Sequence, residues 1–198
     1  MENGFAQAEA ISSASDDILI QAARDGNVDA FGTLFDRNKD AVYRFVLKSI
    51  QRREDAEDIV QEVFCRAWRA MPRFRGDSKL LTWLCRIAAN LCADHGRSAH
   101  RRPTSATEVG LEPGEIDCPD DSNAGVESQS ITRHAVNEAL EKLNVNHRML
   151  VVLCDIQGFT HAEAAQVMGC SAISVRVRLY RARRKLRSLL AGVLDEVK

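Results

Sequence analysis

The sequence is poor in the residues that build β-sheets and membrane spans. Aromatic residues make up 6% of the 198 residues, and β-branched residues rarely alternate with polar ones, which argues against a β-rich fold. No apolar run approaches the roughly 18 residues of a transmembrane helix. The first 16 residues contain neither Lys nor Arg. No cationic signal peptide is therefore predicted at this end, and we expect a cytoplasmic protein without direct membrane insertion.

The six cysteines contain no C-x-x-C pair. Most of them fall at apolar positions of helical patterns, where a free cysteine packs as a small hydrophobic residue. The alternative is a zinc site built from Cys85, Cys92 and His95. It is disfavoured because structural zinc sites draw tight ligand pairs from two separate segments. We therefore predict no metal and no cofactor.

The chain has almost no excess charge, but its charges are strongly segregated. The formal net charge is −1, from 27 basic and 28 acidic residues, which excludes a uniformly basic coat. Residues 104–130 hold seven acidic residues and no Lys or Arg, which predicts a flexible acidic linker. The predicted fold class is all-α, with two small helical domains on either side of that linker. The expected order is a disordered tail (1–14), a first module (15–102), the linker (103–130), a second module (131–192) and a short tail (193–198).

Helical periodicity predicts four helices in the first module. The first is capped by Ser15 and ends near Gly26, and the second carries an apolar stripe. The third stops at Pro72, because proline cannot continue a helix. The fourth is capped by residues 76–78 and runs to about Gly96.

The third predicted helix has two opposite faces. Its apolar residues form one broad stripe, and the face opposite contains Asp58, Gln61 and Glu62. Residues 54–62 hold five acids and no base. This face suits a basic partner surface.

One face of the fourth predicted helix gathers an aromatic ring, an amide and cations. Trp83 lies there beside Lys79, Arg86, Asn90 and Arg97. Such a face suits base stacking and phosphate neutralisation, which single-stranded nucleic acid requires. The alternative is a half-buried Trp83 packed on a neighbouring helix beside solvated arginines. Taken alone, the pattern favours this alternative.

The second module carries a stronger signal. The capping box Thr160–Glu163, a short helix over 161–168, a turn at Gly169 and a longer helix capped by Ser171 predict a helix-turn-helix. Residues 171–190 hold seven cations and no acid. On an ordinary solvent-exposed helix, cations usually have acidic partners at i,i+4. The cations of this helix have none, so the pattern favours DNA binding.

Three motifs, in order, resemble those of the extracytoplasmic-function (group 4) sigma factors of bacterial RNA polymerase, within the sigma-70 family. The first, AEDIVQEVFCRAW (56–68), is similar to the region 2 helix that binds the polymerase clamp. The second, FRGDSKLLTWLCRIAAN (74–90), is similar to the segment that melts and reads the −10 element. The third, GFTHAEAAQVMGCSAISVRVRLYRARRKL (158–186), is similar to the region 4 helix-turn-helix that reads the −35 element. The resemblance covers about 20–102 and 131–191.

The resemblance implies a role for individual residues. Contacts to the β′ clamp helices of core polymerase would come from Asp58, Gln61 and Glu62. Contacts to the −10 DNA, with Asn90 helping to hold a flipped base, would come from Phe74, Arg75, Ser78, Lys79, Trp83, Arg86 and Asn90. Bases of the −35 element would face Arg176, Val177, Tyr180 and Arg181. Further contacts to that DNA, mainly to its phosphates, would come from Ser174, Arg178, Arg183 and Arg184.

The chain departs from the family pattern at two positions in the second helix of the helix-turn-helix. Ile173 stands where many members have Gly, and Val177 stands where many have Ser. Both would put an apolar group near the DNA. The expected partners are core RNA polymerase (β′ clamp helices and β flap), promoter DNA and an anti-sigma factor that clamps both modules.

The leading function is a non-enzymatic promoter-specificity subunit that starts transcription of a stress- or signal-responsive regulon. A free-standing helix-turn-helix regulator that binds duplex DNA without polymerase is the alternative, but it needs neither the acidic face nor the Trp83 face. A nucleic-acid enzyme is disfavoured because Asp55, Glu57 and Asp58 do not share one helix face.

Overall fold

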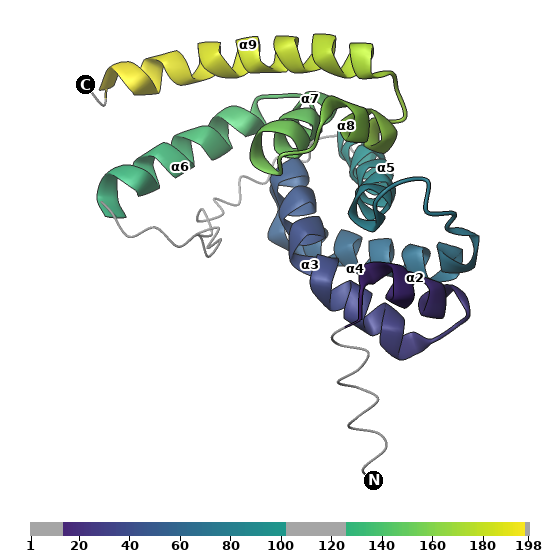
Figure 1. Cartoon of the computed structure of the whole chain (residues 1–198). Helices are drawn as coiled ribbons and strands as arrows, with labels where there is room; N and C mark the ends of the chain where they lie inside the picture. The colour runs from purple at the N-terminus through teal and green to yellow at the C-terminus, as the bar shows by residue number, and fades with distance from the viewer. Residues whose placement is uncertain (1–13, 102–125, 197–198) are drawn as a thin grey trace.

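A computed structural model of the chain describes residues 14–101 and 126–196. Within these residues every regular element is a helix, which confirms the predicted all-α class (Figure 1). Residues 1–13, 102–125 and 197–198 lie outside the described residues, and they include parts of the predicted tails (1–14 and 193–198) and most of the predicted linker (103–130). The elements are α2 (Asp16–Arg24), α3 (Val28–Ile50), α4 (Arg53–Ala70), η1 (Met71–Arg73), α5 (Leu80–Arg101), α6 (Val126–Glu141), α7 (Val145–Val151), η2 (Val152–Ile156), α8 (His161–Met168) and α9 (Ala172–Glu196).

The first module, α2 to α5, is organised around the long helix α3. Helices α2, α4 and α5 all pack against it, and the side chains of Leu34, Val42 and Phe45 are almost completely buried between them. Aromatic pairs hold α3 to α4: the ring centroids of Phe35 and Phe64 lie 4.5 Å apart. Each fully buried side chain of this size stabilises the fold by about 1.5–3 kcal/mol. The apolar stripes seen in the sequence therefore form one common core.

The helix boundaries follow the sequence signals at some ends and not at others. Ser15 occupies the predicted N-cap position of α2, although its side chain makes no capping hydrogen bond, and α4 ends just before Pro72. Helix α5, however, continues through Gly96 to Arg101, so the predicted end near Gly96 is wrong. A methyl group at Gly96 would lie 3.5 Å from the side chain of Val145. Helix α5 therefore passes close to α7 at this glycine.

The two predicted modules pack against each other, and their buried residues form one continuous core. Helix α8 packs on α5, and α7 packs on α3 and α5, so that α7 and α8 cover one end of the first module, while α9 lies across their far side (Figure 1). Helix α6 begins at Val126, within the segment that the sequence predicts to be a linker. The acidic linker therefore joins modules that already touch.

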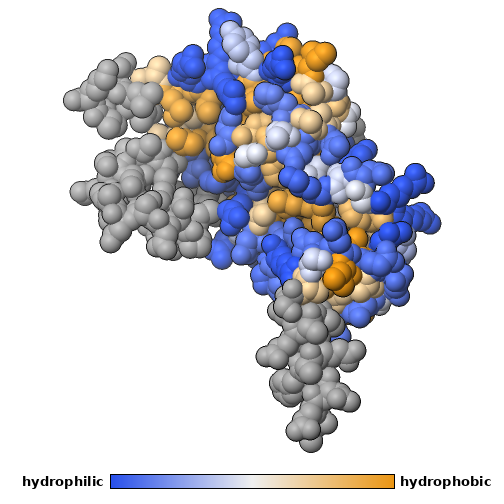
Figure 2. Space-filling model, in the orientation of Figure 1, coloured by the Kyte–Doolittle hydropathy of each residue, from blue (hydrophilic) through white to orange (hydrophobic). Residues whose placement is uncertain are grey.

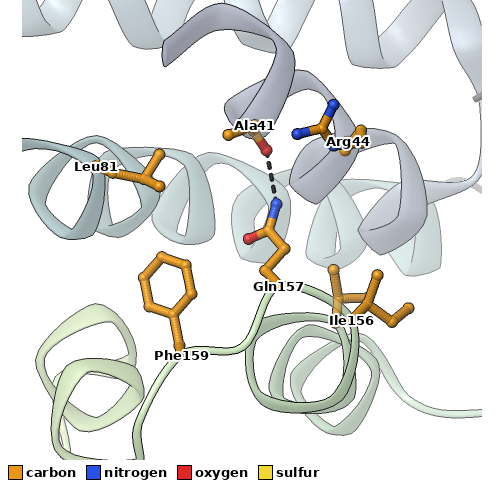
Figure 3. A pocket seen from close by; sticks show the side chains of 7 residues that line it. Ala41, Arg44, Leu81, Ile156, Gln157 and Phe159 are labelled. Carbon is orange, nitrogen blue, oxygen red and sulfur yellow. Dashed lines mark hydrogen bonds between the residues drawn. The ribbon is translucent and has the colours of Figure 1, made fainter. Parts of the chain in front are cut away.

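Polar side chains cross this junction at several points. The Nε2 atom of Gln157 donates a hydrogen bond to the Ala41 carbonyl oxygen at 2.7 Å, and Nε2 of Gln51 donates to the Asn137 carbonyl oxygen at 3.0 Å. Gln157 lies at the edge of a cavity of about 320 Å³. Figure 3 shows that this cavity is lined from both modules, by Ala41, Arg44, Leu81, Ile156, Gln157 and Phe159.

Arg148 is the most connected polar group at the junction. Its guanidinium donates hydrogen bonds at 2.8–3.0 Å to three carbonyl oxygens at the C-terminal end of α6, those of Leu140, Glu141 and Leu143. Its Nη1 atom donates a fourth, at 2.9 Å, to the carbonyl oxygen of Ser49 near the end of α3. The last carbonyls of a helix have no partner within the helix, and they carry partial negative charge. Arg148 therefore satisfies two helix ends, one from each module.

Replacing Arg148 by Ala should lower the free energy of unfolding by about 2–4 kcal/mol, because four carbonyl groups lose a charged donor in a partly buried place. Urea denaturation followed by circular dichroism measures the loss. Lys142→Ala is the control, since it removes an exposed pair with Glu138 that contributes little to stability. Equal losses in the two variants would contradict the role assigned to Arg148.

Candidate nucleic-acid interface

The predicted helix-turn-helix is present and is built by local hydrogen bonds. The Thr160 hydroxyl accepts from the Glu163 backbone N–H at 3.2 Å, while the Glu163 carboxylate accepts from the Thr160 N–H at 2.9 Å, so the predicted capping box is confirmed. Helix α8 ends at Gly169, whose φ of 60° is the left-handed conformation that glycine adopts without strain. Ser171 then accepts from the Ser174 N–H at 3.2 Å and starts α9.

The carboxylate of Glu163 is strongly favoured in its ionised form. The Thr160 N–H first, then the Lys79 ammonium and the Thr160 hydroxyl, lower the pKa of the Glu163 carboxyl to about 2. The Lys79 Nζ atom lies 2.9 Å from Glu163 Oε1. This ion pair joins α8 to the residue that precedes α5, so it links the helix-turn-helix to the first module.

Helix α9 has a buried face and an exposed cationic face. Val175, Leu179 and Ala182 are buried against the rest of the second module. Seven of the eight predicted −35 contacts are exposed on the remaining surface: Arg176, Val177, Arg178, Tyr180, Arg181, Arg183 and Arg184. Figure 2 shows a mainly hydrophilic surface over α9, with a hydrophobic patch near the N-terminal end of the helix. The structure therefore presents these residues together on one side of the molecule.

Two of the predicted −35 residues, Arg183 and Ser174, also make contacts within the protein. The Arg183 guanidinium binds the Asp155 carboxylate with two nitrogens, Nε lying 3.1 Å from Oδ2. This pair ties α9 to η2, a single π-helical turn that continues α7. Ser174 is half-buried beside Ser171. Arg178 is exposed on the flank of α9 nearer to α7.

The cations on this flank act on a nearby histidine. Burial first, and then the positive charges of Lys185, Arg178 and Arg181, lower the pKa of the His147 imidazole in α7. The effect indicates that α9 cations lie near the N-terminal end of α7. An anion such as a DNA phosphate would be stabilised in the same field.

The face of α5 that is predicted to bind single-stranded DNA contains exposed polar residues and one half-buried aromatic ring. Arg86 and Asn90 are exposed, as are Arg75 and Lys79 just before the helix. Trp83 is half-buried and packs on Phe74, with ring centroids 4.8 Å apart. Phe74 itself is only 5% exposed.

The ring of Phe74 is buried and packs against Trp83, so it helps to hold the Trp83 ring in place. The family resemblance implied a contact of Phe74 itself with the −10 DNA, but such a contact would require its ring to leave the core. Ser78 is half-buried at the start of the face. The half-burial of Trp83 agrees with the packing interpretation, and its contact with single-stranded nucleic acid stays a prediction.

The acidic face of α4 lies away from the other helices. Helix α4 packs on α3, α5 and η1, while Asp58 and Gln61 are exposed. Glu62 is half-buried, and its Oε1 atom lies 2.7 Å from Nε of Arg66, one turn further along the helix. Asp58, Gln61 and Glu62 are therefore brought together as predicted, on a surface available to a partner.

The cysteines that were considered as zinc ligands lie in the core. Burial raises the pKa of the Cys85 and Cys92 thiols to about 12, which opposes the thiolate form that binds zinc. His95 instead places Nε2 at 3.2 Å from an Asp55 carboxylate oxygen. Over residues 14–101 and 126–196, no group of three or more His, Cys, Asp or Glu side chains could hold a metal ion.

Comparison with known proteins identifies the two modules. Residues 34–102 match the family model for sigma-70 region 2, and residues 133–186 match the model for sigma-70 region 4. The ECF RNA polymerase sigma-E factor of Escherichia coli is 32% identical over 178 residues, which cover 85% of this chain and 91% of that protein. The chain belongs to the extracytoplasmic-function (ECF) sigma factors of RNA polymerase. This membership favours a sigma factor over the free-standing regulator that the sequence left as an alternative.

Other relatives and solved structures agree with this membership. The ECF sigma factor BldN of Streptomyces coelicolor is 35% identical over 87% of this chain, which spans 64% of that protein. CnrH, solved in complex with the cytosolic domain of CnrY, superposes with a TM-score of 0.66 at 30% identity, covering 90% of this chain and 99% of that one. The fold is also shared with RpoE of Bartonella quintana, solved with the anti-sigma factor NepR, at a TM-score of 0.65 and 24% identity over 83% of this chain and 98% of that one.

In the part of this sigma factor that the structure describes, no helix is both long enough and apolar enough to cross a membrane. The junction residues Arg148, Gln157 and Gln51 were not recognised in the sequence. No local pattern marks them, because each acts through a backbone carbonyl that is distant along the chain. The pairing of Arg183 with Asp155, 28 residues away, was missed for a related reason.

The depressed pKa of Glu163 predicts a pH-dependent contribution to stability. Because the folded-state pKa lies below the ordinary value of 4.5, the contribution is present above about pH 4.5 and is lost as the pH falls toward 2. Glu163→Gln should be about 1 kcal/mol less stable than the parent at pH 7, and the gap should close with acidification. Urea midpoints at pH 7, 5 and 3 measure this, and a gap that is constant with pH would contradict it.

Proposed function

We propose that this ECF sigma factor recruits core RNA polymerase through α4, reads the −35 element through α9 and holds the melted −10 strand on α5. The observation that carries the proposal is the separation of charge between these faces. Asp58 and its neighbours lie on an acidic face of α4, whereas α9 exposes arginines. A protein partner and a polyanion can therefore bind different surfaces of the same chain.

The α9 face suits duplex DNA. Its exposed guanidiniums can each bind guanine O6 and N7 with two hydrogen bonds or bind phosphate oxygens. Arg176 and Arg181 are proposed for bases, and Arg178 for phosphates. Arg183 is held by Asp155, so we expect it to position α9 as well as to contribute positive charge.

The α5 face suits unpaired DNA. Asn90 offers an exposed amide that can hydrogen-bond the edge of a flipped base, and Trp83 offers an aromatic surface for stacking. Lys79 and Arg86 share this face by helical spacing, and Arg75 is exposed shortly before α5, so these cations can neutralise phosphates. Phe74 supports this face by holding the Trp83 ring from below.

The remaining roles follow from membership of the family. We propose that the β flap of core polymerase binds the second module and that an anti-sigma factor binds both modules and keeps the protein inactive until a stress or other signal arrives. The protein has no catalysis of its own in this proposal, since nucleotide addition belongs to core polymerase. It works in the cytoplasm, where polymerase and chromosome meet.

The double variant Asp58→Lys with Gln61→Ala should weaken association with core polymerase by at least about tenfold, because it places a cation against a basic clamp surface. Both side chains are exposed, so the fold should be unaffected. Gel filtration with core enzyme measures association, and circular dichroism measures folding.

The matched control is Asp40→Lys, which makes the same charge change at an exposed position of α3. It should bind core polymerase as the parent does. Tight, specific binding of promoter duplex by the chain alone, with no gain from added polymerase, would overturn the proposed recruitment through α4.

Asn90→Ala should leave polymerase binding and closed-complex formation intact but slow promoter opening by about tenfold, because it removes hydrogen bonds made only to the unpaired strand. Permanganate reactivity of thymines in the −10 element measures opening. Trp83→Ala should act in the same direction but also destabilise the fold, since it removes the ring that packs on Phe74.

Gln21→Ala, which shortens an exposed amide on α2, is the control for Asn90→Ala. It should open promoters at the parental rate. If Asn90→Ala also opens them at that rate, Asn90 does not hold the −10 strand.

A further inference from the structure

Three large apolar side chains are exposed on α9, although a helix with so many cations offers ample polar surface. Ile173 is 74% exposed, Tyr180 is 68% exposed and Val177 is 44% exposed. They make up half of the six large hydrophobic residues that are exposed in the described part of the chain. Leaving them in water gains nothing for folding, which suggests a ligand.

These three residues form a continuous line, here called the apolar ridge. At about 100° per residue, Ile173, Val177 and Tyr180 lie within roughly 60° of one another around the helix. They point away from the buried residues Val175, Leu179 and Ala182. The ridge therefore runs along the outermost line of α9.

Cations flank the apolar ridge on both sides. Arg176 and Arg187 lie on one flank, and Arg178, Arg181 and Lys185 lie on the other, by the same helical geometry. All five are exposed. None of them forms an ion pair with a carboxylate among the residues that the structure describes.

This arrangement is complementary to a DNA major groove. The two phosphate strands bound the groove on either side, and the base edges form its floor. The one apolar group on that floor is the C5-methyl of thymine. An apolar protein partner would have to cover cations on both sides of the ridge, so charge complementarity favours DNA.

We propose that Ile173 and Val177 bind thymine C5-methyl groups and thereby select thymines in the −35 element. The inference rests on the proposed function of α9 and adds the base that these residues prefer. Both residues lie in the first two turns of α9, the part of a recognition helix that contacts base edges. Tyr180 continues the ridge one turn further along.

The spacing along the helix limits where the thymines lie. Ile173 and Val177 are four residues apart, which is about 6 Å along the helix axis. Successive base pairs rise by about 3.4 Å. The two selected thymines should therefore lie within about two base-pair steps of each other.

The test uses the full chain bound to core polymerase and a library of promoter duplexes in which the −35 region is randomised. Sequencing of the bound fraction should show thymine at one or two positions. Each selected thymine is then replaced by deoxyuridine, which lacks only the methyl group. Affinity should fall about threefold to fivefold at each position, the effect of one apolar carbon removed from contact.

Variants identify the residue that makes each contact. Ile173→Ala and Val177→Ala should each abolish the difference between thymine and deoxyuridine at one position and keep it at the other. Ile18→Ala is the matched control, because Ile18 is also an exposed isoleucine, 62% accessible, on α2 of the other module. It should retain the full sensitivity to deoxyuridine.

The outcomes separate this inference from the function on which it rests. A library with no preference at all in the −35 region would overturn the assignment of α9 to that element, and this inference with it. A clear preference without thymine, or equal affinity for thymine and deoxyuridine, would overturn the methyl contacts alone. Sensitivity to deoxyuridine that persists in both variants would likewise exclude Ile173 and Val177.

Discussion

The contact of Arg148 with the ends of two helices is the constraint around which the described structure is arranged. A guanidinium that is partly buried loses hydration, and this cost is offset only when hydrogen-bond acceptors replace the water. Four backbone carbonyls do so here, three from the end of α6 and one from Ser49 in α3. One of these bonds, to Ser49, crosses to the first module, so the contact helps to hold the second module against the first.

The position of the second module decides which surfaces stay open. Helix α8 covers part of α5, and Lys79 pairs with Glu163 across the junction, so one predicted strand contact is engaged by a protein carboxylate. The acidic face of α4 and the outer face of α9 remain exposed. The ion pair of Lys79 is exposed on the lysine side, and such pairs contribute little to stability. A DNA phosphate can therefore compete for the same ammonium.

Much of the fold was predictable because its signals are local. The capping box at Thr160 and the stop at Pro72 act within one helical turn, and both are present as expected. The end of α5 was not predictable, because Gly96 stays helical beside Val145 of α7. The burial of Phe74 was missed for the same kind of reason, since its ring packs in the core and against Trp83 of α5.

The sequence by itself determined the class of the protein: the order of its helices, the cationic second helix of the helix-turn-helix and the acidic face of α4. These features depend on periodicity and on charge, which are properties of neighbouring residues. Only the tertiary structure decided that the two modules share one core, that Arg183 is held by Asp155 and that Ile173 stands on an exposed ridge between cations. Each of these depends on which distant surfaces meet. The free energy of such contacts comes from burial and from carbonyl acceptors that every residue carries, so no sequence motif records them.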